Sequence, residues 1–300
     1  FKQKTAYEIS TRDWSSDVCS SDLEAMSWHG EALNLLYGYA RRTALPRVRA
    51  LHLPPDPAPD RMRGEFCALE LEDGALGLAY VLLGDTLQRL REGGVPLQGA
   101  DPLALAAGFA EGGELRRALG HAAMTALTRS LFDRAGFVPP PSTDSTGQID
   151  AAAGETVGMV GHFTPLIGRL VARGVKLRII ELREDLVRDD GSVRVTTDAR
   201  ELAACRQVLA TGTLLLNDSL ESTLAHCRQA ERLVLLGPSV GVPPDPLFAR
   251  GVTALGGHWV AQPAAFADAL RRGEPTNAFA WKYALAPAGY PGWSTLVARL

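Results

Sequence analysis

Apolar residues recur with helical spacing in three segments of the first half of the chain, residues 24–45, 101–110 and 114–137. Between the first two lies EFCALELEDGALGLAYVLL, in which two β-rich runs flank Asp73-Gly74. Such a dipeptide between alternating apolar runs is typical of a two-residue β-hairpin. The proline-rich stretch PPDPAPDRMRG before it indicates a surface loop. We therefore expect a small α+β unit in which helices pack against a hairpin-based sheet.

The second half of the chain has a different pattern, in which buried strands alternate with helices. Strands are expected at TVGMVG, KLRIIEL, VLATGTLLL, RLVLLG and TALGGHWVA. The helix FTPLIGRLVARG is expected to start at Thr164 as N-cap. The pairs Asp198/Glu201 and Asp218/Glu221 have the spacing of capping boxes for the next two helices. This alternation predicts an α/β fold, with right-handed βαβ units, a parallel sheet and helices on both of its faces.

Residues 1–23 differ from the rest in composition. Lys2 and Lys4 occur there, whereas only Lys176 and Lys282 occur after Glu24. The stretches KQKTAYEI and DWSSDVCSSDL resemble translations of the two constant parts of a sequencing adapter, with STR as the variable index between them. We expect this segment to be an adapter-derived artefact rather than native sequence. The alternative is a genuine disordered tail.

Bulk composition restricts the class of protein. The chain is 46% hydrophobic and 22% charged, with a formal net charge of −3, which is typical of a soluble globular protein. There is no basic stripe, so we expect no nucleic-acid partner. No apolar run approaches the roughly 20 residues of a membrane span, so we expect no membrane partner. Outside residues 1–23, which contain Cys19, the chain has three widely spaced cysteines, Cys67, Cys205 and Cys227, which indicate reduced thiols and a cytoplasmic location. A homo-oligomer is left open.

Ligands of an open parallel sheet bind beyond the carboxyl ends of its strands, where the strand order reverses. The first candidate segment there is GMVGHFT, with Gly158, Gly161, His162 and Thr164. A glycine allows close approach of a ligand, and helix N–H groups favour an anion. The spacing lacks the GxGxxG of a dinucleotide fingerprint, and helix packing alone would also explain the glycines. His162 is the best-placed metal ligand among scattered histidines that form no HxxxH pair.

Three further segments end predicted strands. Glu181 stands where a nucleotide-binding sheet places the acid that binds ribose, although a solvated ion pair with a neighbouring arginine is the alternative. Small polar groups end the next strand, and Asn217 is equally consistent with turn chemistry. The loop after the following strand offers N–H donors and the hydroxyl of Ser239, with no base beside it in sequence. The residues of these last two segments are Thr211, Gly212, Thr213, Asn217, Gly237, Pro238 and Ser239.

The stretches VGMVGHFTPLIGRL, TGTLLLNDSLESTL and LLGPSVGVPPDPLFARGV, with the acid at Glu181, resemble the putative heavy-metal chelation family, a Rossmann-like domain of unknown function. GALGLAYVLL and ELRRALGHAAMTALTRSL are similar to its usual partner, an enolase N-terminal-like domain. The resemblance implies an enolase-N-terminal-like domain in residues 24–140, a linker in 141–154, a Rossmann-like domain in 155–275 and a C-terminal tail in 276–300 that packs on both.

The same resemblance implies a ligand site in the cleft between the two domains, for a heavy metal or a metal-chelating small molecule. The sequence departs from the family pattern at Leu214, Asp218, Ser219 and Thr125, where the family more often has threonine, glycine, threonine and asparagine. We expect a small anionic or metal-chelating ligand, such as a divalent metal or a metal chelate, between the domains near Gly161, His162, Thr213, Asn217 and Ser239. The alternatives are an enzyme that uses NAD or S-adenosylmethionine, with Glu181 on the ribose, and a scaffold whose cleft has lost its ligand.

Overall fold

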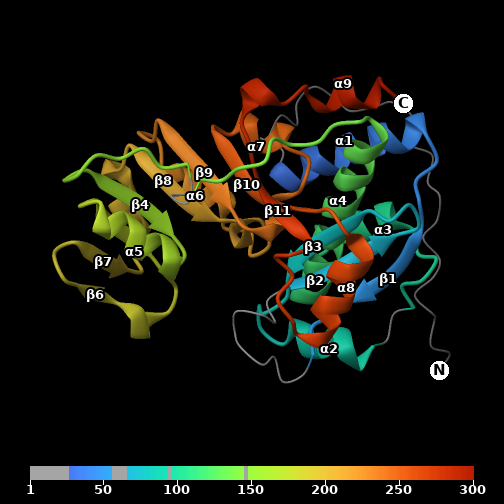
Figure 1. Ribbon diagram of the computed structural model, residues 1–300, viewed down its shortest axis with the longest axis horizontal. Helices are drawn as coiled ribbons and strands as arrows, with labels where there is room; N and C mark the ends of the chain where they lie inside the picture. The colour runs from blue at the N-terminus through green and yellow to red at the C-terminus, as the bar shows by residue number, and fades with distance from the viewer. Residues whose placement is uncertain (1–26, 56–65, 94–95, 145–147) are drawn as a thin grey trace.

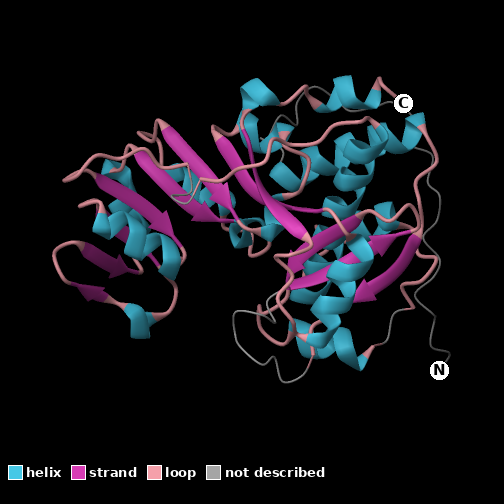
Figure 2. Ribbon diagram, viewed as in Figure 1, coloured by secondary structure: helices cyan, strands magenta, loops and turns pink. Residues whose placement is uncertain are grey.

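The computed structural model describes residues 27–55, 66–93, 96–144 and 148–300. The adapter-like segment and most of the proline-rich loop lie outside these residues. The chain forms two β-sheets with helices packed against both (Figures 1 and 2). We call residues 27–137 the N-terminal part and residues 148–300 the C-terminal part. No helix among the described residues is long and apolar enough to cross a membrane.

The N-terminal part is built on a three-stranded antiparallel sheet in the order β1-β2-β3. The expected hairpin forms from β2 and β3 on either side of Asp73-Gly74, whereas β1 was not predicted. The long helix α4 packs on β3 and carries a mostly buried alanine-rich surface. The elements of this part are α1 (Trp28–Arg42), β1 (Val48–His52), β2 (Phe66–Leu71), β3 (Leu76–Tyr80), α2 (Thr86–Glu92), α3 (Pro102–Ala107) and α4 (Glu114–Arg134).

The C-terminal part contains an eight-stranded sheet in the order β11-β10-β9-β8-β4-β5-β7-β6, whose two edge strands are antiparallel and whose other pairs are parallel. If the six parallel strands are numbered 1 to 6 in chain order, their spatial order across the sheet is 3-2-1-4-5-6. This is the strand order of a doubly wound nucleotide-binding sheet. The strands are β4 (Thr156–Val160), β5 (Lys176–Ile180), β6 (Arg188–Asp189), β7 (Val193–Thr196), β8 (Gln207–Thr211), β9 (Arg232–Leu236), β10 (Ala254–Val260) and β11 (Ala280–Leu285).

Helices cover both faces of this sheet because alternate side chains of each buried strand point to opposite sides. Met159 packs with α5 on one face, while the space beside Gly158 on the other face is filled by Leu202 and Cys205. The longer helices are α5 (Thr164–Ala172), α6 (Leu220–His226), α7 (Asp245–Ala249), α8 (Pro263–Arg272) and α9 (Trp293–Val297). Short 3₁₀ helices are η1 (Glu184–Leu186), η2 (Ala199–Ala204), η3 (Gly212–Leu215), η4 (Pro238–Val240) and η5 (Pro287–Gly289).

The N-cap residues of α5 and α6 differ from those expected from the sequence. Helix α5 begins at Thr164 itself, with Phe163 as the N-cap and without a side-chain cap. Helix α6 has Ser219 as N-cap, also without a side-chain cap bond, so the Asp218 box is wrong. Asp198 does cap η2 by accepting from the N–H of Arg200. The third expected strand is shorter than predicted, since VLATGTLLL turns from β8 into η3 after Thr211.

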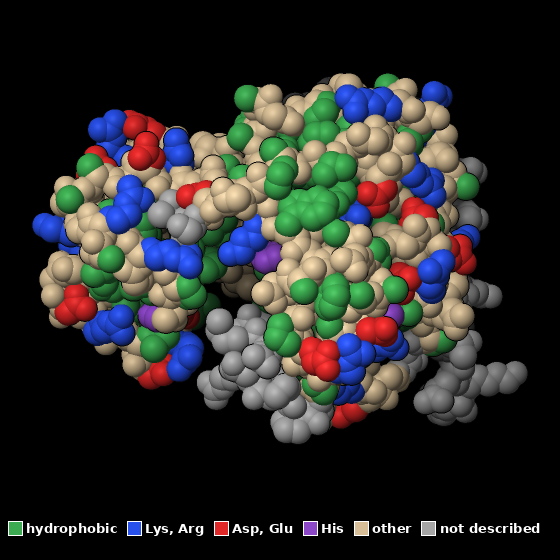
Figure 3. Space-filling model, viewed as in Figure 1, with side chains coloured by type: hydrophobic (Ala, Val, Ile, Leu, Met, Phe, Trp, Pro, Cys, Tyr) green, Lys and Arg blue, Asp and Glu red, His purple; other side chains and the backbone are tan. Residues whose placement is uncertain are grey.

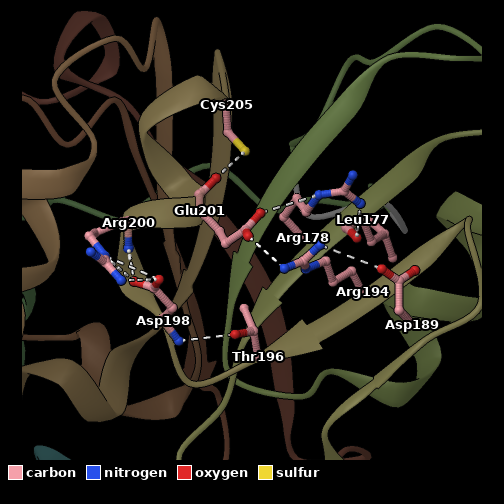
Figure 4. A network of polar contacts seen from close by, with 9 residues as sticks. All are labelled: Leu177, Arg178, Asp189, Arg194, Thr196, Asp198, Arg200, Glu201 and Cys205. Atoms are coloured by element: carbon pink, nitrogen blue, oxygen red, sulfur yellow. Dashed lines mark hydrogen bonds and ion pairs between the residues drawn. The ribbon is translucent and has the colours of Figure 1, made fainter.

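Glu201, the expected partner of Asp198 in a capping box, instead forms ion pairs with arginines of the neighbouring strands β5 and β7 (Figure 4). Arg178 of β5 and Arg194 of β7 are directly opposite in the parallel register. Glu201 lies between them, with its Oε1 3.0 Å from Arg194 Nη2 and its Oε2 3.6 Å from Arg178 Nε. The carboxylate thus separates two like charges across two strands, and this contact competes with a capping box.

Two segments expected to be irregular take part in the sheet. The start of the linker, with Pro140 just before it, runs along the edge of β11, where Ser142 N–H donates to Lys282 O at 2.8 Å and Ala284 N–H to Pro140 O at 3.2 Å. The expected tail contributes β11 itself. The division of the chain into domains at the expected boundaries stays a prediction.

Candidate functional site

The carboxyl ends of β4, β8, β9 and β10 point toward the N-terminal part (Figure 1). Strands β4 and β8 are neighbours, and the chain leaves them toward opposite sides of the sheet, so the strand order reverses between them. Such a reversal leaves a crevice at the carboxyl edge, and ligands of doubly wound sheets bind there. On the viewed face, the space-filling surface is hollowed between the two lobes of the molecule (Figure 3).

Gly161 and His162 form the turn that follows β4. Gly161 has φ +92°, and a Cβ at this position would lie 3.1 Å from Thr211 Cγ2 of β8. Only glycine takes this conformation at low cost, so its presence lets the two strand ends come together. The Nδ1 atom of His162 is 3.3 Å from Thr164 Oγ1. Its Nε2 is shielded from solvent and has no hydrogen-bond partner among the described residues.

The hydroxyls that follow β8 bond to each other. Thr211 Oγ1 accepts from the N–H of Thr213 at 3.3 Å and from the Thr213 hydroxyl at 3.1 Å. Gly212 packs against Val240, which is 2.8 Å from the position of an added Cβ. Thr211 thus lies beside the turn of Gly161 and His162, so two hydroxyls and one imidazole occur at the ends of β4 and β8.

Asn217 is engaged in a turn. Its Oδ1 accepts from both the N–H and the hydroxyl of Ser219. The next residue, Asp218, has φ +60° and pairs with Arg117 of α4 at 3.4 Å. Asn217 thus stabilises a turn through its side chain, which was the alternative to a ligand-binding role in the sequence analysis.

The carboxylate of Glu181 is directed to its own loop. Its Oε1 accepts from the N–H of Leu182 at 2.9 Å and from the N–H of Arg183 at 3.3 Å. The neighbouring arginines have other acid partners, since Arg178 pairs with Glu201 and Arg183 with Asp185. Glu181 does stand at the end of β5, as the sequence predicts.

Ser239 belongs to the junction between the two parts. It is buried, its hydroxyl accepts from the N–H of Tyr80 at 3.2 Å, and its carbonyl accepts from Nε2–H of His121 at 2.7 Å. Gly237, which precedes η4, has φ +131°. Pro238 lines a cavity of about 40 Å³ between α4, β10 and β11. The loop after β9 therefore joins the sheet to the N-terminal part.

Gly158 lies inside β4 rather than at its end. An added Cβ would be 2.8 Å from Leu202 Cδ2 and 3.2 Å from Cys205 Cβ. This contact confirms the packing interpretation for Gly158. The structure thus brings Gly161, His162, Thr211 and Thr213 together, while Gly158, Asn217 and Ser239 serve packing, a turn and the junction.

Sequence reasoning missed the polar residues of the junction. His121 is fully buried on α4, and burial lowers the pKa of its imidazole to about 4. Burial also lowers the pKa of His258 on β10 to about 4, with a smaller contribution from Lys282. A signal for His258 exists in the run GGHWV, because adjacent glycines in a strand often mark a close approach. His121 has no such signal in its alanine-rich helix.

Metal-ligating residues are dispersed in the part of the chain that the structure describes. No group of three or more histidine, cysteine or acidic side chains there could hold a metal ion. Cys67, Cys205 and Cys227 are free and buried. Burial raises the pKa of the Cys67 thiol to about 12 and that of Cys227 to about 11. Among the described residues at the ends of β4 and β8, the candidate ligand atoms are the Nε2 of His162 and the hydroxyls of Thr211 and Thr213.

Comparison with known families identifies the sheet and its loops. Residues 144–287 match the model of the DUF364 family, which is described as putative heavy-metal chelation. This part of the chain belongs to the DUF364 family. The match includes the crevice residues and the junction loop of Ser239. No curated protein matches the chain.

Solved structures of DUF364 proteins have the same fold. A DUF364 protein of unknown function from Pyrococcus horikoshii is 17% identical, with a TM-score of 0.62, over 85% of this chain and 99% of its own. One from Desulfitobacterium hafniense is 18% identical, with a TM-score of 0.60, over 84% of this chain and 98% of its own. These DUF364 structures match both parts of the chain in fold. The enolase-like origin of the N-terminal part stays a prediction.

Proposed function

We propose that the protein binds a metal chelate at the carboxyl edge of its parallel sheet, in the crevice between β4 and β8. The observation that carries the proposal is the unpartnered Nε2 of His162 at the point where the strand order reverses. The description of the DUF364 family, putative heavy-metal chelation, supports a metal-bearing ligand.

The chemistry of the crevice suits a complex that brings most of its own donors. An imidazole nitrogen is a good ligand for first-row transition metals such as nickel, copper and zinc. One such nitrogen fills one coordination position, while the hydroxyls of Thr211 and Thr213 can hydrogen-bond the organic part of the ligand. A chelator that occupies the other positions of the metal would complete the coordination.

The test compares nickel(II) chloride, nickel(II) citrate and metal-free citrate in thermal denaturation of the protein. A ligand that binds only the folded state raises the melting temperature in a concentration-dependent way. We expect the largest rise with nickel citrate, and we expect His162→Ala to abolish it. His226→Ala is the matched control, because it removes another partly exposed histidine, on α6.

An equal rise with nickel citrate in wild type and in His162→Ala would exclude this crevice. An equal rise with metal-free citrate would show that the metal is not recognised. Loss of the rise in both histidine variants would indicate nonspecific binding of nickel to surface histidines, and it too would contradict the proposal.

A second candidate function is an enzyme that uses NAD or S-adenosylmethionine. The strand order 3-2-1-4-5-6 favours it, because this order is the usual one for nucleotide binding. Glu181 ends the strand that carries the ribose-binding acid in such sheets. The same denaturation assay with NAD and S-adenosylmethionine tests this function, and Glu181→Ala should then remove the stabilisation without affecting the response to nickel citrate.

We also propose a cytoplasmic location. Its support is the state of the three described cysteines, which are all free and buried. A secreted protein of similar make-up would more often pair its thiols. Titration of the denatured protein with a thiol reagent directly after extraction checks this, and finding disulfides would contradict it.

A further inference from the structure

The cavity of about 40 Å³ at the junction is separate from the crevice proposed above. It is lined by residues of β3 and α4 on one side and of η4, β10 and β11 on the other. Its polar lining includes Thr128, Arg129, His258 and Tyr283. A water molecule needs about 10–15 Å³ of such volume, so the cavity has room for roughly three atoms of that size.

Tyr283 reaches the cavity because Gly257 has no side chain. The two residues are opposite each other in the β10–β11 ladder, and a Cβ on Gly257 would lie 2.4 Å from both Cζ and the hydroxyl oxygen of Tyr283. Tyr283 is only 7% exposed, and it lines the cavity. Burial raises the pKa of Tyr283, so the hydroxyl keeps its proton and can donate it.

Arg129 supplies the positive charge. Its guanidinium lies 3.8 Å from the ring centroid of Trp259, its Nη1 donates to Val260 O at 2.8 Å, and its Nε donates to Asp133. These three contacts hold the group in one position. None of these three contacts uses Nη2 of Arg129, which lines the cavity and has further N–H groups to donate.

We propose that this cavity is a binding site for a small oxyanion with the geometry of a carboxylate, such as formate. A guanidinium nitrogen and a tyrosine hydroxyl are both donors, and a ligand that only accepts hydrogen bonds matches them. Formate has three non-hydrogen atoms, which matches the available room. His258 Nδ1 has no hydrogen-bond partner among the described residues and adds a third donor when it carries the proton of the neutral ring.

The main competitor is a cluster of ordered water. Asp133 already pairs with Arg129 and offsets part of its charge. Its side chain is 43% exposed, however, so solvent screens the carboxylate more than the guanidinium, which is 15% exposed. The positive charge of the Arg129 guanidinium therefore contributes more to the electrostatic potential in the cavity than the negative charge of Asp133 does.

The experiment measures the melting temperature of the full chain in sodium formate, sodium chloride and formamide, with ionic strength held constant for the salts. Formate should stabilise the wild type more than chloride does. Formamide has the size of formate without its charge and should stabilise less. Tyr283→Phe should weaken the apparent affinity for formate about tenfold or more, since it removes one donor to a charged group.

Tyr37→Phe is the matched control, because Tyr37 lies on α1 and is 39% exposed. It should leave the response to formate unchanged. An equal response of wild type and Tyr283→Phe, or equal stabilisation by formate and formamide, would overturn the proposal in favour of water. If Tyr283→Phe fails to fold, a crystal structure of the wild type grown in formate decides, since water in the cavity instead of formate would also overturn it.

Discussion

The imidazole of His121 is fully buried between α4 and η4, where its Nε2–H donates to Ser239 O. Burial lowers its pKa from 6.5 to about 4. As the pH falls through this range, the unfolded chain takes up a proton before the folded chain does, so stability present above pH 6.5 is lost toward pH 4. We expect this residue to lower the free energy of unfolding by about 2 kcal/mol between pH 7 and pH 5. Urea denaturation at both values measures the change.

His121→Gln keeps a donor that can face Ser239 but cannot titrate. In this variant, we expect the loss between pH 7 and pH 5 to be smaller by about the same 2 kcal/mol. His258 contributes in the same direction, because its pKa is also lowered to about 4, so a residual slope should remain. An unchanged pH dependence in His121→Gln would show that the ring is not buried as described.

At the scale of elements, Glu201 joins β5 and β7 through Arg178 and Arg194. Glu201→Gln leaves two guanidinium groups facing each other across the strands, and we expect a loss of about 0.5–1 kcal/mol. Because the side chains are partly exposed, the loss should shrink in 0.5 M NaCl. Denaturation in urea at low and high salt measures both effects.

Glu231→Gln provides the comparison for this prediction. Glu231 also pairs with an arginine, Arg206, but both side chains are mostly exposed, at 64% and 73%. Such a surface pair contributes little to stability, so we expect a change close to zero. A loss as large as that of Glu201→Gln would contradict the role of Glu201 between two strands.

The pattern of apolar residues was sufficient to predict the hairpin and five of the six parallel strands, whereas the short strand β7 was missed. Each of the predicted strands has a continuous or alternating run with turn residues beside it. The helix starts were less predictable, because caps depend on neighbours that are distant in sequence. Glu221, for example, accepts from the N–H of Trp28 at 3.1 Å instead of closing a capping box. The edge strand β11 was missed because its residues AWKYAL were taken as part of a tail.

At the scale of the molecule, Ser239 connects the two parts. Ser239→Ala removes the hydroxyl that accepts from Tyr80 N–H, and loss of such a hydrogen bond costs about 0.5–1.5 kcal/mol. We expect a destabilisation of this size in urea denaturation. Ser222→Ala, at an exposed serine that donates to Ser219 O, should change stability by less than about 0.5 kcal/mol. Equal effects of the two substitutions would contradict the importance of the junction.

The reversal of strand order between β4 and β8 agrees with the doubly wound sheet that the sequence predicts, and the carboxyl ends of parallel strands meet at one edge of such a sheet. The junction was not predicted from the sequence, since its bonds join residues far apart in the chain. Tyr80 and Ser239 are separated by 159 positions, and no local pattern records their contact. The roles of Asn217 and Ser239 were therefore not separable from that of His162 on sequence alone.

The segment that runs beside β11 has a consequence for the behaviour of the protein in solution. An open edge strand can pair with the edge of another molecule and start aggregation. Here Pro140 and Ser142 occupy backbone groups of β11, and a proline cannot donate a ladder hydrogen bond to an incoming strand. The opposite edge is β6, which has only two residues, Arg188 and Asp189, both exposed and charged. Both edges of the large sheet are thus poor templates for intermolecular β-pairing.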